Sequence, residues 1–108
     1  MKCLHIITPV KDSIDSTLET VKAIMESDIL VPFTYTVYND FSTEENTHRL
    51  EEAARQWNFR LVNLSDLTDH PSPNYLLVLQ TAQKEAIEAD AGLLIVESDV
   101  DRKSTRLN

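Results

Sequence analysis

Polar and acidic residues occur in three clusters, each directly after a short apolar run that predicts a β-strand. The clusters are Thr8-Pro9-Val10, Asn39-Asp40-Phe41-Ser42 and Glu97-Ser98-Asp99. In an open parallel sheet, ligands bind outside the carboxyl ends of the strands, at the point where the strand order reverses. We therefore expect the three clusters to form one site, and their acidic character indicates a ligand that binds with the help of a metal ion.

The acidic pair after the last apolar run is the candidate metal site. Glu97 and Asp99 are two positions apart, so on an extended chain they point to the same side. Such a pair can hold Mg²⁺ or Mn²⁺ through oxygen, while the remaining coordination positions of the ion take a diphosphate. A metal held there would offset the charge that builds on a leaving phosphate. The alternative is a solvated turn at the end of a strand.

The other polar residues divide into ligand candidates and structural candidates. Asn39 and Asp40 are candidates for hydrogen bonds to a nucleobase edge or a ribose, and Ser42 is a candidate N-cap for the following helix. His70 follows the third predicted strand and is a candidate phosphate contact. His5 alternates with apolar residues in the first strand, which favours a hydrogen-bonded structural role.

The elements that must position these clusters alternate between strands and helices. Strands are predicted at residues 4–8, 33–39, 59–64 and 93–96, with Pro9 ending the first; the last is apolar on both faces and is expected to be central in its sheet. Helical periodicity occupies the intervals, with start signals at Ser16, Ser42 and Ser72-Pro73. Parallel strands joined through helices cross over right-handedly. The prediction is an α/β fold: a three-layer, Rossmann-like parallel sheet, β-α-β-α-β-α-β, with strand order 3-2-1-4.

Composition narrows the function classes. A chain of 108 residues with 42% hydrophobic content is too short for two domains, and a net charge of -8 argues against a large nucleic-acid interface. Gly92 is the only glycine, which excludes a dinucleotide fingerprint and a phosphate loop. Cys3 is the only cysteine, which excludes an internal disulfide and a cysteine-rich zinc site. With no apolar run near the roughly 20 residues of a membrane span and no expected signal peptide, we expect a cytoplasmic protein.

The composition changes abruptly after Val100. Residues 101–108 have no apolar period, and they resemble the translated sequence of a common sequencing-library adapter. The alternative is a solvated basic tail, and neither interpretation assigns it a function. We therefore divide the chain into residues 1–100, which belong to the domain, and a non-native tail at residues 101–108.

The three clusters together resemble family 2 glycosyltransferases of the GT-A fold. The residues that carry the resemblance are Ile6-Ile7-Thr8-Pro9-Val10, Val37-Tyr38-Asn39-Asp40-Phe41-Ser42-Thr43 and Leu94-Ile95-Val96-Glu97-Ser98-Asp99-Val100. They are similar to the family's opening strand, its D-D-G-S-T turn and its D-x-D strand. The chain departs from the family pattern at Val10, where an aromatic residue is frequent, and at Asn39 and Phe41, which replace the first acid and the glycine of the turn.

The resemblance implies a nucleotide-sugar site and a metal site. The residues expected to contact the nucleotide sugar are Thr8, Pro9, Val10, Asn39, Asp40 and Ser98, with Asp40 meeting the nucleobase. Asp99 would bind Mn²⁺ or Mg²⁺ and the diphosphate, with Glu97 in place of the usual first aspartate. Family members transfer a sugar from a nucleotide donor to an acceptor, many using a carboxylate base from a later segment. The chain would be the donor-binding half, inactive alone, with the acceptor, a glycan, lipid or protein, unknown.

Two other functions are compatible with the same pattern. A nucleotidyltransferase-like enzyme would need a glycine-rich basic loop after the first strand, where this chain supplies only Lys11. A non-enzymatic α/β interaction domain would show no change in thermal stability when nucleotide is added. A ligand that binds the fold, at about 100 times its dissociation constant, would raise the free energy of unfolding by roughly 2.7 kcal/mol.

Overall fold

The computed structural model describes residues 3–97, and this range folds as alternating strands and helices. Apolar residues of period two form the strands, and the helices carry one apolar face each. In chain order the elements are β1 (Cys3–Val10), α1 (Ile14–Met25), β2 (Phe33–Asn39), α2 (Glu44–Trp57), β3 (Arg60–Asn63), the 3-10 helix η1 (Leu64–Asp66), α3 (Tyr75–Glu88) and β4 (Ala91–Ile95).

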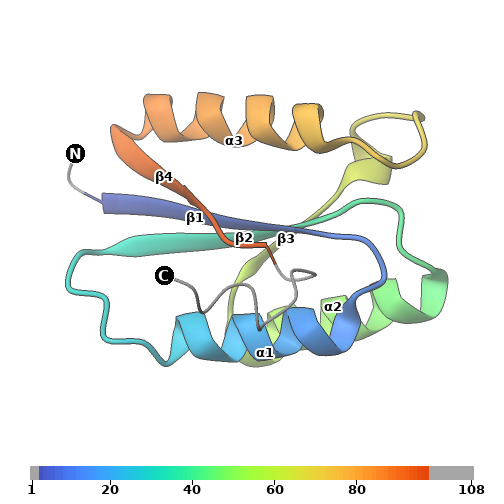
Figure 1. Cartoon of the computed structure of the whole chain (residues 1–108), viewed down its shortest axis with the longest axis horizontal. Coiled ribbons are helices and arrows are strands. Elements are labelled where there is room, and N and C mark those ends of the chain that lie inside the picture. Colours follow the sequence, from blue (N-terminus) through green and yellow to red (C-terminus); the bar gives the residue numbers. More distant parts are fainter. Residues whose placement is uncertain (1–2, 98–108) are drawn as a thin grey trace, which may run out of the picture.

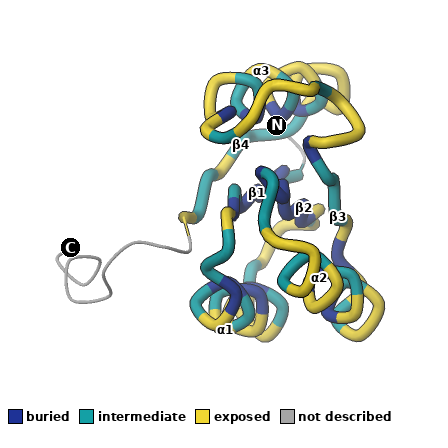
Figure 2. The backbone as a smooth tube through the Cα atoms, turned by 90° about the vertical axis from the view of Figure 1, so that its right-hand side faces the viewer, coloured by how far each residue is buried: buried dark blue, intermediate teal, exposed yellow. Residues whose placement is uncertain are grey.

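The four strands form one parallel sheet in the order β3-β2-β1-β4. Helix α3 covers one face, and α1 and α2 cover the other, so the molecule has three layers (Figures 1 and 2). This confirms the predicted α/β fold and the predicted strand order. The reversal lies at β1, which pairs with β2 on one side and β4 on the other.

The hydrophobic core is divided by the sheet into two clusters. The cluster beneath α1 and α2 includes Ile6, Val21 and Leu50, and the cluster beneath α3 includes Ile7 and Val78. Ile6 and Ile7 are adjacent in β1 and point to opposite faces, as the pleat of a strand requires. Both faces of β1 are therefore buried, which holds its carboxyl end firmly in place.

The sequence predicted that Pro9 would end the first strand, but β1 continues to Val10. Odd-numbered residues of β1 direct their backbone groups toward β4, because the Val96 N–H donates to the Ile7 carbonyl at 2.9 Å. Even-numbered residues face β2, since the Asp40 N–H donates to the Val10 carbonyl at 2.8 Å. The backbone of Pro9 thus faces the β4 side, and the pairing between β1 and β4 ends at Ile7. Proline, which has no N–H to donate, therefore costs the sheet no hydrogen bond at this position.

Three local expectations are also corrected. The N-cap of α2 is Thr43 rather than Ser42, and the Thr43 side chain accepts a hydrogen bond from Asn46 N. Helix α1 begins at Ile14 with Ser13 at its N-cap, so Ser16 lies inside the helix. Helix α3 begins at Tyr75, beyond the predicted start at Ser72-Pro73.

Strand β4 is at the edge of the described sheet rather than at its centre. Its Leu94 is 45% exposed, and β4 has β1 as its one neighbouring strand among the described residues. None of the helices within residues 3–97 has the length and apolar character needed to cross a bilayer.

Candidate functional site

The carboxyl ends of β1 and β2 lie side by side, as the sequence predicted. Val10 and Asn39 are partners in the parallel register, and the next residue, Asp40, donates its N–H to the Val10 carbonyl at 2.8 Å. The chain then leaves both strands in the same direction. The loops that follow β1 and β2 are therefore neighbours at the carboxyl edge of the sheet.

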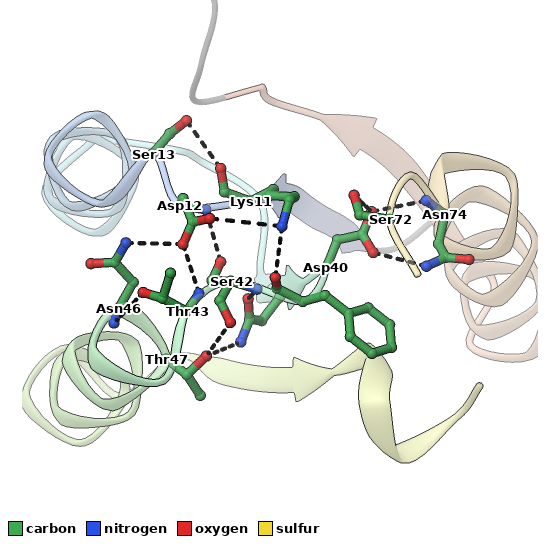
Figure 3. A network of polar contacts seen from close by, with 12 residues as sticks. Lys11, Asp12, Ser13, Asp40, Ser42, Thr43, Asn46, Thr47, Ser72 and Asn74 are labelled. Carbon is green, nitrogen blue, oxygen red and sulfur yellow. Dashed lines mark hydrogen bonds and ion pairs between the residues drawn. The ribbon is translucent and has the colours of Figure 1, made fainter. Parts of the chain in front are cut away.

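Polar contacts fasten these two loops to each other (Figure 3). Lys11 Nζ donates to the Phe41 carbonyl at 2.8 Å, and the Asp12 N–H donates to Ser42 Oγ at 2.8 Å. Asp12 Oδ1 accepts from the Thr43 N–H at 2.7 Å and from Asn46 Nδ2 at 3.0 Å. These two donors, Asn46 foremost, hold the pKa of Asp12 below its ordinary value.

Two residues of the fastened loops adopt left-handed backbone conformations. The φ angles are 63° at Asp12 and 62° at Phe41. Such a conformation costs a residue with a side chain about 1–2 kcal/mol, and glycine adopts it freely. Phe41, a residue with a bulky side chain, therefore adopts a conformation that glycine would adopt more easily.

Asn39 is occupied by internal hydrogen bonds. Its side chain is buried, and its Nδ2 donates to Thr47 Oγ1 at 2.8 Å and to Asn63 Oδ1 at 2.9 Å. Its Oδ1 accepts from the Ser42 N–H at 3.1 Å. Asn39 therefore joins the ends of β2 and β3 and the start of α2, and these contacts use both polar groups of its side chain.

Asp40 is buried and anchors the segment that leads into α3. Its Oδ2 accepts from the Asn74 N–H at 2.8 Å and from Ser72 Oγ at 2.9 Å, and its Oδ1 accepts from Asn74 Nδ2 at 2.9 Å. Both carboxylate oxygens are thus engaged within the protein (Figure 3). A nucleobase would have to share these oxygens or displace the 72–74 segment.

Glu97 lies at the same carboxyl edge of the sheet as Asp40, and its side chain contacts the first residue of α3. It follows β4 and its Oε2 accepts a hydrogen bond from the Tyr75 hydroxyl at 3.2 Å. Asn74 binds Asp40 and Tyr75 binds Glu97, so two consecutive residues join the acids that follow β2 and β4. The structure thereby brings Asp40 of the second cluster and Glu97 of the third cluster to the start of α3, with the Glu97 side chain exposed.

The residues of the first cluster contribute mainly backbone to this edge. Thr8 and Val10 point into the core beneath α1 and α2 and are 0% and 4% exposed. Thr8 Oγ1 accepts from the Tyr35 hydroxyl at 2.7 Å. Pro9 points to the opposite face and is half-buried. A ligand at this edge would meet the Pro9 ring and the backbone of its neighbours.

Ser98 and Asp99 lie outside the described residues, so their expected roles stay predictions. Within residues 3–97, no group of three or more His, Cys, Asp or Glu side chains is placed to hold a metal ion. Of the predicted metal pair, the structure describes Glu97 alone.

The imidazole rings of His5 and His70 bind other partners than Asp40 and Glu97. His5 is buried in β1, where its Nδ1 lies 2.8 Å from Thr34 Oγ1, in agreement with a structural role. His70 is exposed in the loop before α3, and its Nδ1 lies 2.8 Å from the Pro71 carbonyl. Its predicted phosphate contact stays a prediction.

The sequence interpretation missed the residues that bind the acids and fasten the loops. Asp12, Ser72, Asn74 and Tyr75 were not predicted at the site, although the first three lie in loops that precede helices and Tyr75 is the first residue of α3. A polar residue directly before a helix, such as Asn74, is a recognisable signal. Its long-range partner is not.

The comparisons with known proteins bear on the fold. No protein-family model matches this chain, and no curated protein sequence matches it. Among solved structures, it is similar to the crystal structure of residues 1–349 of TarS from S. aureus, a glycosyltransferase, with 21% sequence identity and a TM-score of 0.59. The chain has a glycosyltransferase-like fold. The match covers 92% of this chain and 28% of that chain, so this chain spans little more than a quarter of its length.

Proposed function

We propose that this chain is the donor-binding part of a glycosyltransferase of the family 2 type. The observation that carries the proposal is the similarity to the TarS structure over 92% of the chain. The convergence of the ends of β1, β2 and β4 on one edge supports it, because ligands of open parallel sheets bind there. The proposed ligand is a nucleoside-diphosphate sugar.

The donor would lie across the edge between Pro9, the 40–43 loop and Glu97. Hydrogen bonds between the 11–12 and 41–43 segments give this edge a defined shape before any ligand arrives. Such preorganisation reduces the entropy lost on binding. In the proposal Asp40 orders the segment before α3 as well as facing the nucleobase, since its oxygens already bind Ser72 and Asn74.

Glu97 and Asp99 would hold Mn²⁺ or Mg²⁺ together with the diphosphate. Glu97 fits this role because its carboxylate is exposed and, among the described residues, it is hydrogen-bonded by the Tyr75 hydroxyl. Oxygen ligands of this kind suit both ions. The ion, when bound, offsets the negative charge that develops on the leaving diphosphate.

Transfer requires groups outside the part proposed here. The bond between the sugar's anomeric carbon and the diphosphate breaks, a bond to an acceptor hydroxyl oxygen forms, and a base takes the hydroxyl proton. We place the base and the acceptor site in the part of such an enzyme that this chain, covering 28% of the TarS structure, does not span. The chain alone is therefore expected to bind donor without transferring sugar.

Calorimetry with nucleoside diphosphates tests the proposal. Binding of UDP, or of another nucleoside diphosphate, should require Mn²⁺ or Mg²⁺, and Asp99→Ala should weaken it by about tenfold or more, since one charged contact is worth about 1.5–3 kcal/mol. Glu52→Ala, which removes an exposed acid from α2, is the matched control and should leave binding unchanged.

The opposite results are equally informative. Binding of the same strength without a divalent ion would eliminate the metal role of Glu97 and Asp99. If no nucleoside diphosphate binds under either condition, the donor-binding proposal fails and the interaction-domain alternative gains support.

A further inference from the structure

A cavity lies at the amino ends of the strands, at the edge opposite the candidate donor site. Its lining includes the first residue of every strand: Cys3 of β1, Phe33 of β2, Arg60 of β3 and Ala91 of β4. The cavity volume is about 600 Å³, within the range of small-molecule sites. Its position makes it independent of the donor site.

Two buried polar atoms of this lining have no hydrogen-bond partner among the described residues. They are His5 Nε2 and Thr36 Oγ1, and the two residues are 6% and 1% exposed. His5 Nε2 lies 3.3 Å from Glu85 Oε1, which is within ion-pair distance. Buried polar atoms are nearly always paired, so these two indicate an occupant that carries hydrogen-bonding groups.

The charges of the lining cancel within the protein. Arg60 donates from both terminal nitrogens to the two oxygens of Glu85, each at 2.9 Å. Burial lowers the pKa of His5, against an opposing effect of Glu85, so its ring is neutral near pH 7. A lining without net charge favours a neutral ligand over an anion or a cation.

The polar and apolar groups of the lining indicate which kind of neutral ligand would fit the cavity. The Thr34 and Thr36 hydroxyls can donate and accept, the Glu85 carboxylate accepts, and one nitrogen of the neutral His5 ring donates while the other accepts. Met25 and Phe33 add apolar surface to the same lining. Hydroxyl groups suit such a mixture because each of them both donates and accepts, and the C–H groups of a polyol suit the apolar part.

We propose that this cavity binds a neutral polyol of monosaccharide size, with hydroxyl groups that bond to His5 Nε2 and Thr36 Oγ1. The site is distinct from the donor site, and the proposal does not rest on the proposed transferase function. Thr36 and His5 lie on β2 and β1, so an occupant would bridge the two central strands from one end.

Titration of the full chain with D-glucose, followed by amide chemical shifts, tests the proposal. Shifts are expected at Cys3, His5 and Thr36, and Thr36→Val should weaken the affinity by about tenfold, the effect of one lost hydrogen bond. Thr36→Val keeps the side-chain shape, so the fold is expected to persist. Thr20→Val makes the same change on α1, outside the cavity, and should bind glucose like the unchanged protein.

The single cysteine provides a second readout. Cys3 lines the cavity and is the only thiol of the chain, so bound glucose should slow its reaction with a thiol reagent. The proposal is overturned if glucose produces neither shifts nor protection, which would leave water as the occupant. It is overturned equally if Thr36→Val binds like the unchanged protein, or if glucose 6-phosphate binds far more tightly than glucose and so reveals an anion site.

Discussion

At the scale of single residues, the buried hydroxyls of Tyr35 and Thr8 are paired across neighbouring strands. The Tyr35 hydroxyl donates to Thr8 Oγ1 at 2.7 Å, and both side chains are buried beneath α1 and α2. Burial raises the pKa of Tyr35 to about 12, in spite of this hydrogen bond, so the hydroxyl stays protonated. The pair fixes Thr8 beside the carboxyl end of β1.

Tyr35→Phe is expected to lower the free energy of unfolding by about 1–2 kcal/mol, because Thr8 Oγ1 loses its buried donor. Urea denaturation measures the change. The double variant Tyr35→Phe, Thr8→Val should recover most of the loss, since it removes both polar partners together. Additive losses in the double variant would show that the hydrogen bond is not the cause.

At the scale of elements, the position of α3 depends on a carboxylate from β2. The buried Asp40 side chain accepts three hydrogen bonds from Ser72 and Asn74, and Asn74 is the N-cap of α3. The side chain therefore ties the start of the helix to the sheet across the carboxyl edge.

Asp40→Ala should destabilise the fold by about 2 kcal/mol or more, because the buried Asn74 and the partly buried Ser72 lose their acceptor. Amide hydrogen exchange should accelerate most at the start of α3, and denaturation measures the overall loss. Asp66→Ala removes an exposed acid from η1. It should change the free energy of unfolding by no more than about 0.5 kcal/mol and leave the amide exchange rates at the start of α3 unchanged. Unchanged exchange at Asn74 in Asp40→Ala would contradict this account of the helix start.

At the scale of the whole molecule, a polar cluster connects α3 to three strands at the amino edge. Glu85 of α3 binds Arg60 of β3 at 2.9 Å, approaches His5 of β1 at 3.3 Å and lies 3.5 Å from the Tyr38 hydroxyl of β2. The hydrogen bonds from Arg60 hold the pKa of Glu85 below its ordinary value. Desolvation lowers the pKa of His5, with Glu85 opposing and Arg60 adding to the shift.

The fold should therefore lose stability as the pH falls through the range in which His5 takes up a proton. The folded-state pKa of His5 is below the ordinary 6.5, so below pH 6.5 the unfolded chain binds more protons and gains stability relative to the fold. Denaturation at several pH values between about 7 and about 5.5 measures the slope, which one group limits to about 1.4 kcal/mol per pH unit. His5→Asn should flatten it, whereas His48→Asn, at an exposed position on α2, should not. An unchanged slope in His5→Asn would assign the dependence to other groups.

Much of the architecture is encoded in local pattern. Alternating apolar residues at 33–39 predicted β2 with its observed bounds, and the βαβ alternation predicted the strand order β3-β2-β1-β4. Local signals were less accurate at helix starts. Ser42 matched a capping motif, yet its hydroxyl is used by Asp12 of another loop, and Thr43 caps α2 instead.

The sequence by itself determined the fold class, the parallel strand order and the edge at which polar residues gather, because periodicity and crossover handedness are local properties of the chain. Tertiary structure decided which of those polar side chains are used in internal hydrogen bonds. Asp40 is bonded to Asn74 and Asn39 to Asn63, partners 34 and 24 positions away, and no local pattern specifies contacts of that range. The amino-edge cavity likewise exists only after β1, β2, β3 and α3 have packed together, since its lining comes from separate elements.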